Sequence, residues 1–311
     1  MGPTACRIAA EARADRLKGV ALVLFGSALW GASGSLTKLL KRHGFTIYDI
    51  LAWRYFIGLL ALILLATVCF EAPSLRRDLR TLRPAVLLAL CMLGMTAAFT
   101  WSNFFTTVAD AIALSYTAPL FAAVLAWAIL GEEIRGLHRL AVAIGVGGVA
   151  VFGFGAAGPA DATQTVLSPN VPFGNLLALL SGLLFGGYIV FARKYAQREG
   201  AVLITTIWQF LMLSLLTLPV LPFTLFKGIS PAGYFILAVY AILCTAAPIL
   251  LLNLAGLFLK AHESSVLALS EIPFAIVIGM ATLGEYPSLL SWLGVTLILV
   301  AGGLASGQET G

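Results

Sequence analysis

The chain has 311 residues, of which 60% are apolar and only 11% are charged, and its formal net charge is +5. Soluble domains carry about 25% charged residues, and the mean hydropathy of +0.99 excludes a surface that water could cover. The composition therefore predicts an integral membrane protein. Because the basic residues are sparse, we expect them to meet lipid headgroups, and we expect no nucleic acid partner.

Ten apolar stretches are long enough to cross a bilayer as helices, because about 20 apolar residues span the ~30 Å hydrocarbon layer. Each stretch is apolar on all faces, which favours helices over the alternating strands of a membrane barrel. We expect an all-α, polytopic membrane protein with ten transmembrane helices. In chain order the predicted spans are 19–37, 47–70, 84–105, 109–130, 138–157, 173–191, 202–226, 232–257, 264–283 and 289–306.

Lysine and arginine are divided unevenly between the two sides of these helices. The loops on the side of the N-terminus contain 14 of them and the opposite loops contain 4, while Arg54 lies inside the second span. Basic loops tend to remain in the cytoplasm. The count predicts an inner (plasma) membrane protein whose ends, residues 1–18 and 307–311, are both cytoplasmic.

The sequence matches itself at an offset of 155 residues, with a slip of a residue or two late in each half. Self-similarity over such a distance indicates two structural repeats. The matched segments are Leu29-Trp30-Gly31 with Leu184-Phe185-Gly186, Trp53-Arg54-Tyr55 with Trp208-Gln209-Phe210, and Pro119 with Leu130-Gly131-Glu132 against Pro273 with Leu283-Gly284-Glu285.

Each repeat, residues 19–157 and residues 173–306, contains five predicted spans. Because five is odd, the second repeat must enter the membrane from the side opposite to the first. Inverted repeats of this kind occur in secondary transporters, where the substrate binds near the midplane between the halves. The polar, proline-rich segment 158–172 is the predicted external linker.

These motifs resemble the EamA branch of the drug/metabolite transporter superfamily. The resemblance rests on Trp30-Gly31, on Lys38, on Arg54 and on the two Pro…Leu-Gly-Glu runs, and it covers residues 19–306. It implies a ten-helix transporter with an inverted-repeat fold that exports small metabolites and has cytoplasmic termini.

Enzyme motifs do not explain the chain. Ser33 stands in a sequence similar to that of intramembrane serine proteases, but no histidine is predicted at a similar depth to act as its base. His262-Glu263 lacks the second histidine of a zinc-binding H-E-x-x-H motif, and no Walker A sequence is found. We therefore expect a protein that is not an enzyme and that carries no metal and no cofactor.

Within the superfamily, the chain is also similar to the aromatic amino acid exporters. Tyr116, three residues before Pro119, and the aromatic pair Phe185 and Tyr188 match positions of those proteins. The chain departs from them at Ala118 and Phe185, where they carry tryptophan. The resemblance implies an amino acid substrate. A broad drug exporter or another metabolite carrier of the same fold, and a non-transporting scaffold or enzyme, are the alternatives.

Two ionisable side chains lie deep in predicted spans, where a charge costs at least ~2.5–3.5 kcal/mol. Glu271, two residues before Pro273, is a candidate site for a substrate ammonium or a coupling proton, or a structural partner of Arg54. Arg54 can bind a carboxylate bidentately or anchor its helix. Pro119 and Pro273 remove backbone donors and are the candidate hinges.

Several aromatic residues and one asparagine are also predicted away from the membrane surface. A tyrosine or tryptophan at this depth must place its polar group, which favours a cavity-facing position over simple packing. With Glu271, the candidate substrate-binding residues are Trp30, Trp101, Asn103, Tyr116, Phe185, Tyr188 and Tyr240. Together they predict a carrier that exports a small molecule by alternating access. We expect this carrier to be a monomer.

Overall fold

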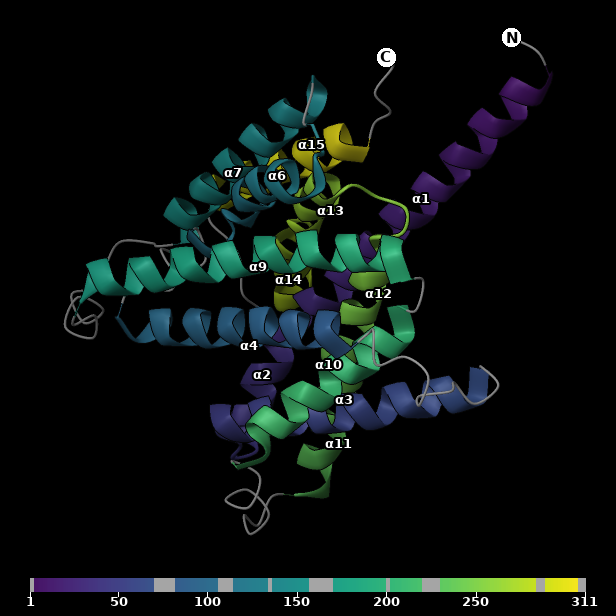
Figure 1. The fold of residues 1–311 in the computed structure, drawn as a ribbon. Coiled ribbons are helices and arrows are strands. Elements are labelled where there is room, and N and C mark those ends of the chain that lie inside the picture. The colour runs from purple at the N-terminus through teal and green to yellow at the C-terminus, as the bar shows by residue number, and fades with distance from the viewer. Residues whose placement is uncertain are drawn as a thin grey trace.

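The computed structural model describes residues 3–69, 82–105, 114–133, 136–156, 170–199, 202–219, 230–283 and 289–306. Within these residues all regular secondary structure is helical (Figure 1). The helices are α1 (Pro3–Gly31), α2 (Ser33–Arg42), α3 (Ile47–Cys69), α4 (Leu82–Phe105), α6 (Ala118–Leu130), α7 (Leu137–Ala156), α9 (Val171–Glu199), α10 (Val202–Thr217), α11 (Pro231–Ala241), a π-helical segment (Ile242–Ala246), α12 (Ala247–Ala255), α13 (Ala261–Ala268), α14 (Glu271–Leu283) and α15 (Leu289–Ser306).

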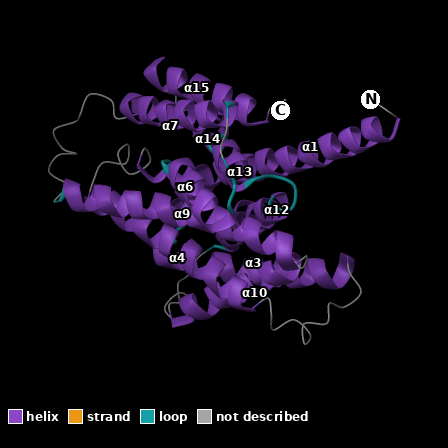
Figure 2. Cartoon of the chain, turned by 45° about the horizontal axis from the view of Figure 1, so that its top comes forward, coloured by secondary structure: helices purple, strands orange, loops and turns teal. Residues whose placement is uncertain are grey.

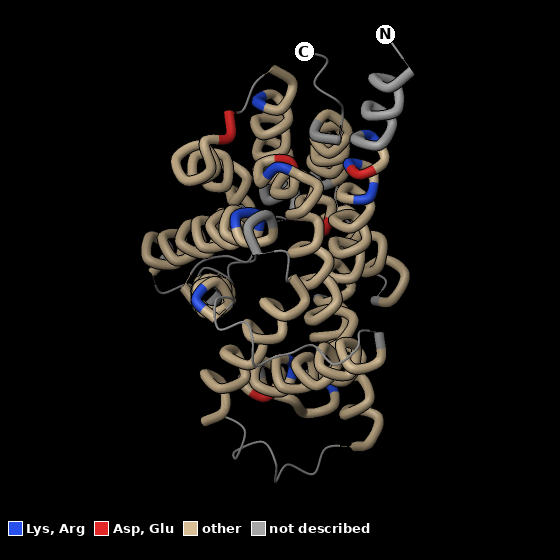
Figure 3. The backbone as a smooth tube through the Cα atoms, turned by 45° about the vertical axis from the view of Figure 1, so that its right-hand side comes forward, with Lys and Arg blue, Asp and Glu red and all other residues tan. Residues whose placement is uncertain are grey.

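The helices account for the ten predicted spans. Six helical segments of the described chain are long and apolar enough to cross a membrane, judged by length and composition, and four shorter apolar helices lie between them. The four are Ala118–Leu130, Leu137–Phe152, Val202–Thr217 and Trp292–Leu304. Charged residues are rare along the tube and most of its length carries none (Figure 3). The all-α, polytopic fold predicted from the sequence is confirmed.

Several spans differ in extent from their prediction. The first begins earlier, since α1 starts at Pro3, and it continues beyond residue 37 because α1 ends at Gly31, the chain turns at Ala32, and α2 carries on to Arg42. The helix of the seventh span, α10, ends at Thr217 instead of reaching residue 226. The sixth continues beyond residue 191 to Glu199, since its charged last turns leave the apolar layer without leaving the helix. The predicted external linker lies mostly outside the described residues, and α9 begins at Val171.

The two repeats run in opposite directions. Near the start of the first span, midway along α1, Arg16 pairs with Glu263 at the start of α13, at 2.7 Å. Near the end of α9, Arg193 pairs with Glu132, whose other oxygen accepts the backbone N–H of Ala261 at 3.1 Å. The start of the first span and the end of the sixth therefore lie at the same face. Because α1 and α9 are the first helices of the two repeats, the repeats are inverted.

Two pairs of equivalent residues contact each other. Trp30 and Phe185 have their ring centroids 6.0 Å apart at an interplanar angle of 72°. Tyr55 and Phe210 have theirs 6.1 Å apart at 75°. Members of each pair are exactly one repeat offset apart in the sequence. A residue can touch its own equivalent only near a two-fold axis, so the pseudo-two-fold axis passes close to both pairs.

Helix packing repeats when the halves are exchanged. The third span packs on the sixth through α4 and α9, which run side by side in Figure 1, and the eighth packs on the first through α12 and α1. The fourth span likewise packs on the sixth through α6 and α9, and the ninth on the first through α14 and α1. Two further large contacts join equivalent helices, α3 with α10 and α7 with α15. The α7 and α15 pair lies along one edge of the molecule (Figure 2).

Candidate substrate site

The fourth and ninth spans are both discontinuous. A turn at Tyr116 and Thr117 precedes α6, and a turn at Leu269 and Ser270 separates α13 from α14. Each turn lies just before one of the predicted hinge prolines, Pro119 or Pro273, in agreement with the loss of a helical donor there. Broken helices meeting between inverted repeats are the usual frame of a transporter binding site.

The two breaks are joined by their side chains. The Tyr116 hydroxyl and the Glu271 carboxyl group lie close enough to interact electrostatically, and the hydroxyl is the group that can donate to an ionised carboxylate. Tyr116 comes from the first repeat and Glu271 from the second, and both are half-buried. The structure thus brings together two residues that the sequence placed 155 positions apart, on opposite sides of the pseudo-two-fold axis.

Arg54 is held in an aromatic setting on α3. Its Nη1 donates to the Tyr240 hydroxyl at 3.3 Å, and its guanidinium carbon lies 5.0 Å from the Tyr55 ring centroid and 5.6 Å from that of Tyr240. Its Nε is buried without a hydrogen-bond partner among the described residues. These contacts hold the side chain through π-systems and one phenol, and none of them supplies a compensating negative charge.

The expected ion pair between Arg54 and Glu271 is not formed within the described part of the chain, since each has a different partner. Cys244, in the π-helical segment of the eighth span, is buried and feels the electrostatic influence of both. π-Helical turns often occur at functional sites. Here the π-helical segment starts two residues after Tyr240, contains Cys244 and packs on α3, the helix that carries Arg54.

Trp30 and Phe185 lie beside the same breaks. The neighbour of Trp30, Gly31, packs on the backbone of α14 at Phe274 and Ala275, one turn after Glu271. Trp30 itself is 9% exposed and Phe185 is half-buried. The aromatic pair therefore offers an apolar surface next to the polar groups of the two turns.

Tyr188 is also buried but belongs to a separate polar network. Its hydroxyl donates to Asn253 Oδ1 at 2.8 Å, and Asn253 Nδ2 donates to Thr206 at 2.9 Å. Gln209 lies at 3.4–3.5 Å from the same groups and completes the network. Sequence reasoning missed Asn253. Its lone amide within an apolar span was the available signal, because such a group needs partners.

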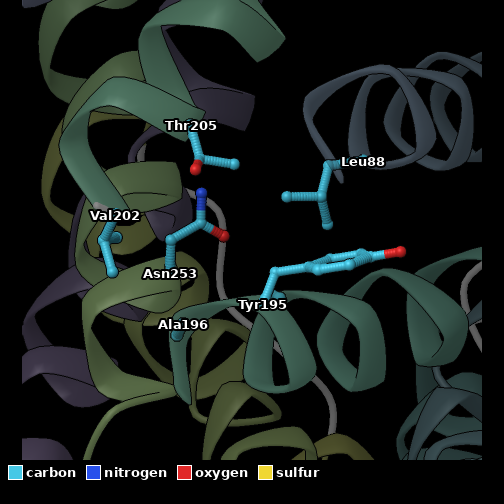
Figure 4. Close-up of a pocket in the computed structure, with 7 residues that line it drawn as sticks. Leu88, Tyr195, Ala196, Val202, Thr205 and Asn253 are labelled. Atoms are coloured by element: carbon cyan, nitrogen blue, oxygen red, sulfur yellow. The ribbon is translucent and has the colours of Figure 1, made fainter. Parts of the chain in front are cut away.

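A small pocket opens beside this network. It is lined by Leu88 of α4, by Tyr195 and its neighbours on α9, by Thr205 of α10 and by Asn253 (Figure 4). In the close-up the Asn253 amide points toward Thr205, and the Tyr195 ring lies below the Leu88 side chain. The pocket is apolar apart from this edge, so it does not resemble a site for a charged ligand.

Two other predicted residues lie away from the breaks. Trp101, near the end of α4, is 55% exposed and stacks on Phe105 at 6.5 Å between ring centroids. The side chain of Asn103 lies outside the described residues. The structure thus groups Tyr116, Glu271, Trp30 and Phe185 at the centre, adds Tyr240 through Arg54, and separates Trp101 from them.

The fold has the features of a two-repeat carrier, and a comparison with known protein families identifies the family of the chain. Residues 17–154 and residues 172–306 each match the EamA-like transporter family. The chain belongs to this family. The two EamA-like units coincide with the two halves that contact each other across the pseudo-two-fold axis, and the function indicated at this level is that of a membrane transporter of the drug/metabolite type.

Two further likenesses agree with the EamA-like assignment. The chain is 24% identical over 226 residues to the uncharacterized membrane protein YMR253C of Saccharomyces cerevisiae, a match that covers 65% of this chain and 51% of that protein. It thus spans about half the length of this curated relative. A protein solved by crystallography shares the fold with a TM-score of 0.72 at 16% identity, over 92% of this chain and 96% of the other.

One cluster in this EamA-like chain has the donor types of a metal site. The ligand atoms of His138, His262 and Glu263 lie within 4.8 Å of one another, and all three residues are buried. However, an Arg16 nitrogen lies 2.7 Å from Glu263 Oε1 and 3.3 Å from His138 Nε2. The guanidinium thus already serves as the cation of this cluster, and we do not assign a metal to it.

Proposed function

We propose that the protein exports amino acids, with aromatic or hydrophobic ones preferred, by alternating access through a central site between the repeats. The observation that carries the proposal is that two ionisable side chains near Cys244, Arg54 and Glu271, have no partner of opposite charge among the described residues. Arg54 has no carboxylate contact in the described structure, and Glu271 has only a neutral phenol. A zwitterion supplies the missing partner to each.

The proposed binding mode follows from these groups. The α-carboxylate of the substrate meets the guanidinium of Arg54, whose planar donors suit a carboxylate. The α-ammonium meets the carboxylate of Glu271, and an apolar side chain lies against Trp30 and Phe185. Burial of the substrate between the broken helices removes water from both charges, which strengthens each interaction.

Alternating access would use the same two turns. Small residues on the first and sixth spans let them lie directly on the backbones of α14 and α6, and such contacts favour sliding and rocking of packed helices. Pro119 and Pro273 are the proposed hinges. A proton on Glu271 would neutralise one of the two substrate-binding charges, so we propose this residue as the coupling group, and we place both termini in the cytoplasm of the inner membrane.

Transport assays in liposomes test the proposal. We expect counterflow uptake of phenylalanine and related amino acids. In Arg54→Gln the uptake should fall at least about tenfold, which corresponds to about 1.4 kcal/mol. Glutamine is the residue at the equivalent position of the second repeat, so it fits this helix. Arg42→Gln, at an exposed site on α2, is the matched control and should transport normally.

The same assay distinguishes an amino acid carrier from a broad drug exporter. Phenethylamine has the ring and the ammonium of phenylalanine but lacks the carboxylate. An amino acid carrier should transport it poorly, and Arg54→Gln should not reduce that transport further. Equal transport of phenethylamine and phenylalanine by both variants would instead indicate a carrier of organic cations and would contradict the proposal.

A further inference from the structure

A network of charged residues ties together five spans at one face of the bundle. We call it the N-terminal-face network, because it lies where the first span begins. It contains two carboxylates, two guanidiniums and two imidazoles, and it joins both repeats. Its members are Arg16 of α1, Glu132 after α6, His138 of α7, Arg193 of α9, and His262 and Glu263 of α13.

The centre of the network is a triangle of three atoms from three helices. Glu263 Oε1 lies 2.7 Å from an Arg16 nitrogen and 3.0 Å from His138 Nε2, and this Nε2 lies 3.3 Å from the same Arg16 nitrogen. The side chains of His138 and Glu263 are 2% and 4% exposed. The contact therefore joins the ends of the first, fifth and ninth spans in a setting with little water.

The two contacts of His138 Nε2 exclude each other. Nε2 accepts a hydrogen bond from Arg16 only when it carries a lone pair, and it donates to Glu263 only when it carries a proton. A proton on Nε2 therefore turns an attraction toward Arg16 into a repulsion. If the imidazole is protonated on both nitrogens, two cations lie 3.3 Å apart and share one carboxylate.

The charge balance of the network makes this step decisive. With neutral imidazoles, Arg16 and Arg193 balance Glu263 and Glu132. A single added proton leaves a net positive charge, and removing an unbalanced charge from water costs free energy. Separation of the helices lets water reach the network and removes that cost.

Within the part of the chain that the structure describes, further charged groups lie around the network. On α1, Asp15 is engaged by Lys18 at 2.8 Å in an exposed pair. Lys260, before α13, adds a further positive charge, and Glu133 and Arg139 lie on the exposed side. The helix α15, which packs on α7 and α13, carries no charged residue.

We propose that His138 is a proton-binding site whose protonation releases Arg16 from Glu263 and opens this face of the carrier. The site differs from the central one at Glu271. The proposal rests on the alternating-access part of the proposed function and is independent of the substrate. In the described conformation the contact of Arg16 with Glu263 is made, so this face is closed.

A distance measurement tests the proposal without any substrate. Spin labels are attached to Leu17→Cys of α1 and Leu137→Cys of α7, both at exposed positions next to the triangle, in a chain whose four native cysteines are replaced by alanine. The full chain is placed in lipid nanodiscs at about pH 8 and about pH 5.5, a range over which histidine changes its charge. We expect one short distance at the higher pH and an added longer distance at the lower pH.

Three variants assign the change to His138. His138→Gln should keep the short distance at both pH values, because glutamine does not titrate. His43→Gln, at the opposite face, where His43 contacts Ser230 at 3.1 Å, is the matched control and should shift as the parent does. Glu263→Gln should show the longer distance at both pH values, because Arg16 loses the charge that holds it.

The outcomes are decisive in either direction. An unchanged distance in the parent chain, or a His138→Gln variant that shifts as the parent does, overturns the proposal. If His138→Gln does not fold, His262→Gln replaces it as the test. A retained shift in that variant, together with the constant long distance of Glu263→Gln, supports His138, and a lost shift overturns it.

Discussion

Gly186 of α9 lies directly against Ala118 at the start of α6, so that a Cβ on Gly186 would come within 2.8 Å of the Ala118 carbonyl oxygen and 2.8 Å of the Ala122 nitrogen. Both are backbone atoms and cannot turn away as a side chain could. We therefore expect Gly186→Ala to separate the sixth span from the broken fourth span. By analogy with overpacked cores, the cost is about 1–3 kcal/mol.

Thermal unfolding in detergent measures this effect. Gly187→Ala is the control, because a Cβ at Gly187 would meet its nearest neighbour at an ordinary 3.8 Å. The variant at Gly186 should melt at a lower temperature than the parent, whereas the variant at Gly187 should not. Equal melting of the two variants would mean that α9 and α6 adjust freely to each other.

The position of Glu271 beside Tyr116 leads to a prediction of how transport responds to pH. If Glu271 carries the coupling proton, Glu271→Gln removes the titratable group but retains a polar side chain of the same size. We expect this variant to exchange substrate across liposomes in counterflow, but to lose accumulation driven by a pH gradient. Transport by Glu271→Gln with the pH dependence of the parent would remove Glu271 from this role.

Tyr116→Phe tests the neighbour of Glu271. The substitution deletes the hydroxyl that can donate to the ionised carboxylate. Because Glu271 remains, we expect accumulation to persist with an altered pH profile, and not to be abolished. A profile identical to that of the parent would show that Tyr116 does not influence the carboxylate during transport.

The network around Tyr188 predicts an effect on stability. Tyr188→Phe leaves Asn253 Oδ1 without the donor that lies at 2.8 Å, and an unsatisfied buried polar group costs about 1–3 kcal/mol. We expect a lower melting temperature. Tyr195→Phe is the control, because Tyr195 is a half-buried residue that lines a small pocket and takes no part in the hydrogen bonds of this network. Equal losses in the two variants would contradict the assigned role of the network.

The membrane architecture could be predicted from the sequence because its main constraint is simple. A span must be about 20 apolar residues long, and an odd number of spans in each repeat fixes the inversion. The sequence offset that aligns Trp30 with Phe185 also pairs two residues whose rings are in contact in the structure. Helix ends were less predictable, since Arg193 and its neighbours continue α9 into a polar environment without a local signal for its end.

The polar contacts could be predicted only in part. Glu263 stands just before the predicted ninth span, where a carboxylate can cap the helix, and it does accept the Lys260 N–H at 3.0 Å. It is nevertheless buried, because Arg16 and His138 reach it from two other helices. Loop position in the sequence does not show which helix ends converge. For the same reason, the hydrogen bonds of Asn253 could not be predicted, because its partners come from α9 and α10.

The two tryptophans proposed for the substrate pathway should differ in function. Trp30 is buried beside the discontinuous spans and contacts Phe185, whereas Trp101 is largely exposed on the side of α4 and contacts Phe105. We expect Trp30→Phe to alter the relative counterflow rates of phenylalanine and smaller amino acids, because it changes the apolar surface near the central site. Trp101→Phe should leave these ratios unchanged, since its surroundings fit a lipid-facing ring. If Trp101→Phe changes substrate preference and Trp30→Phe does not, the substrate passes along α4 rather than along the pseudo-two-fold axis.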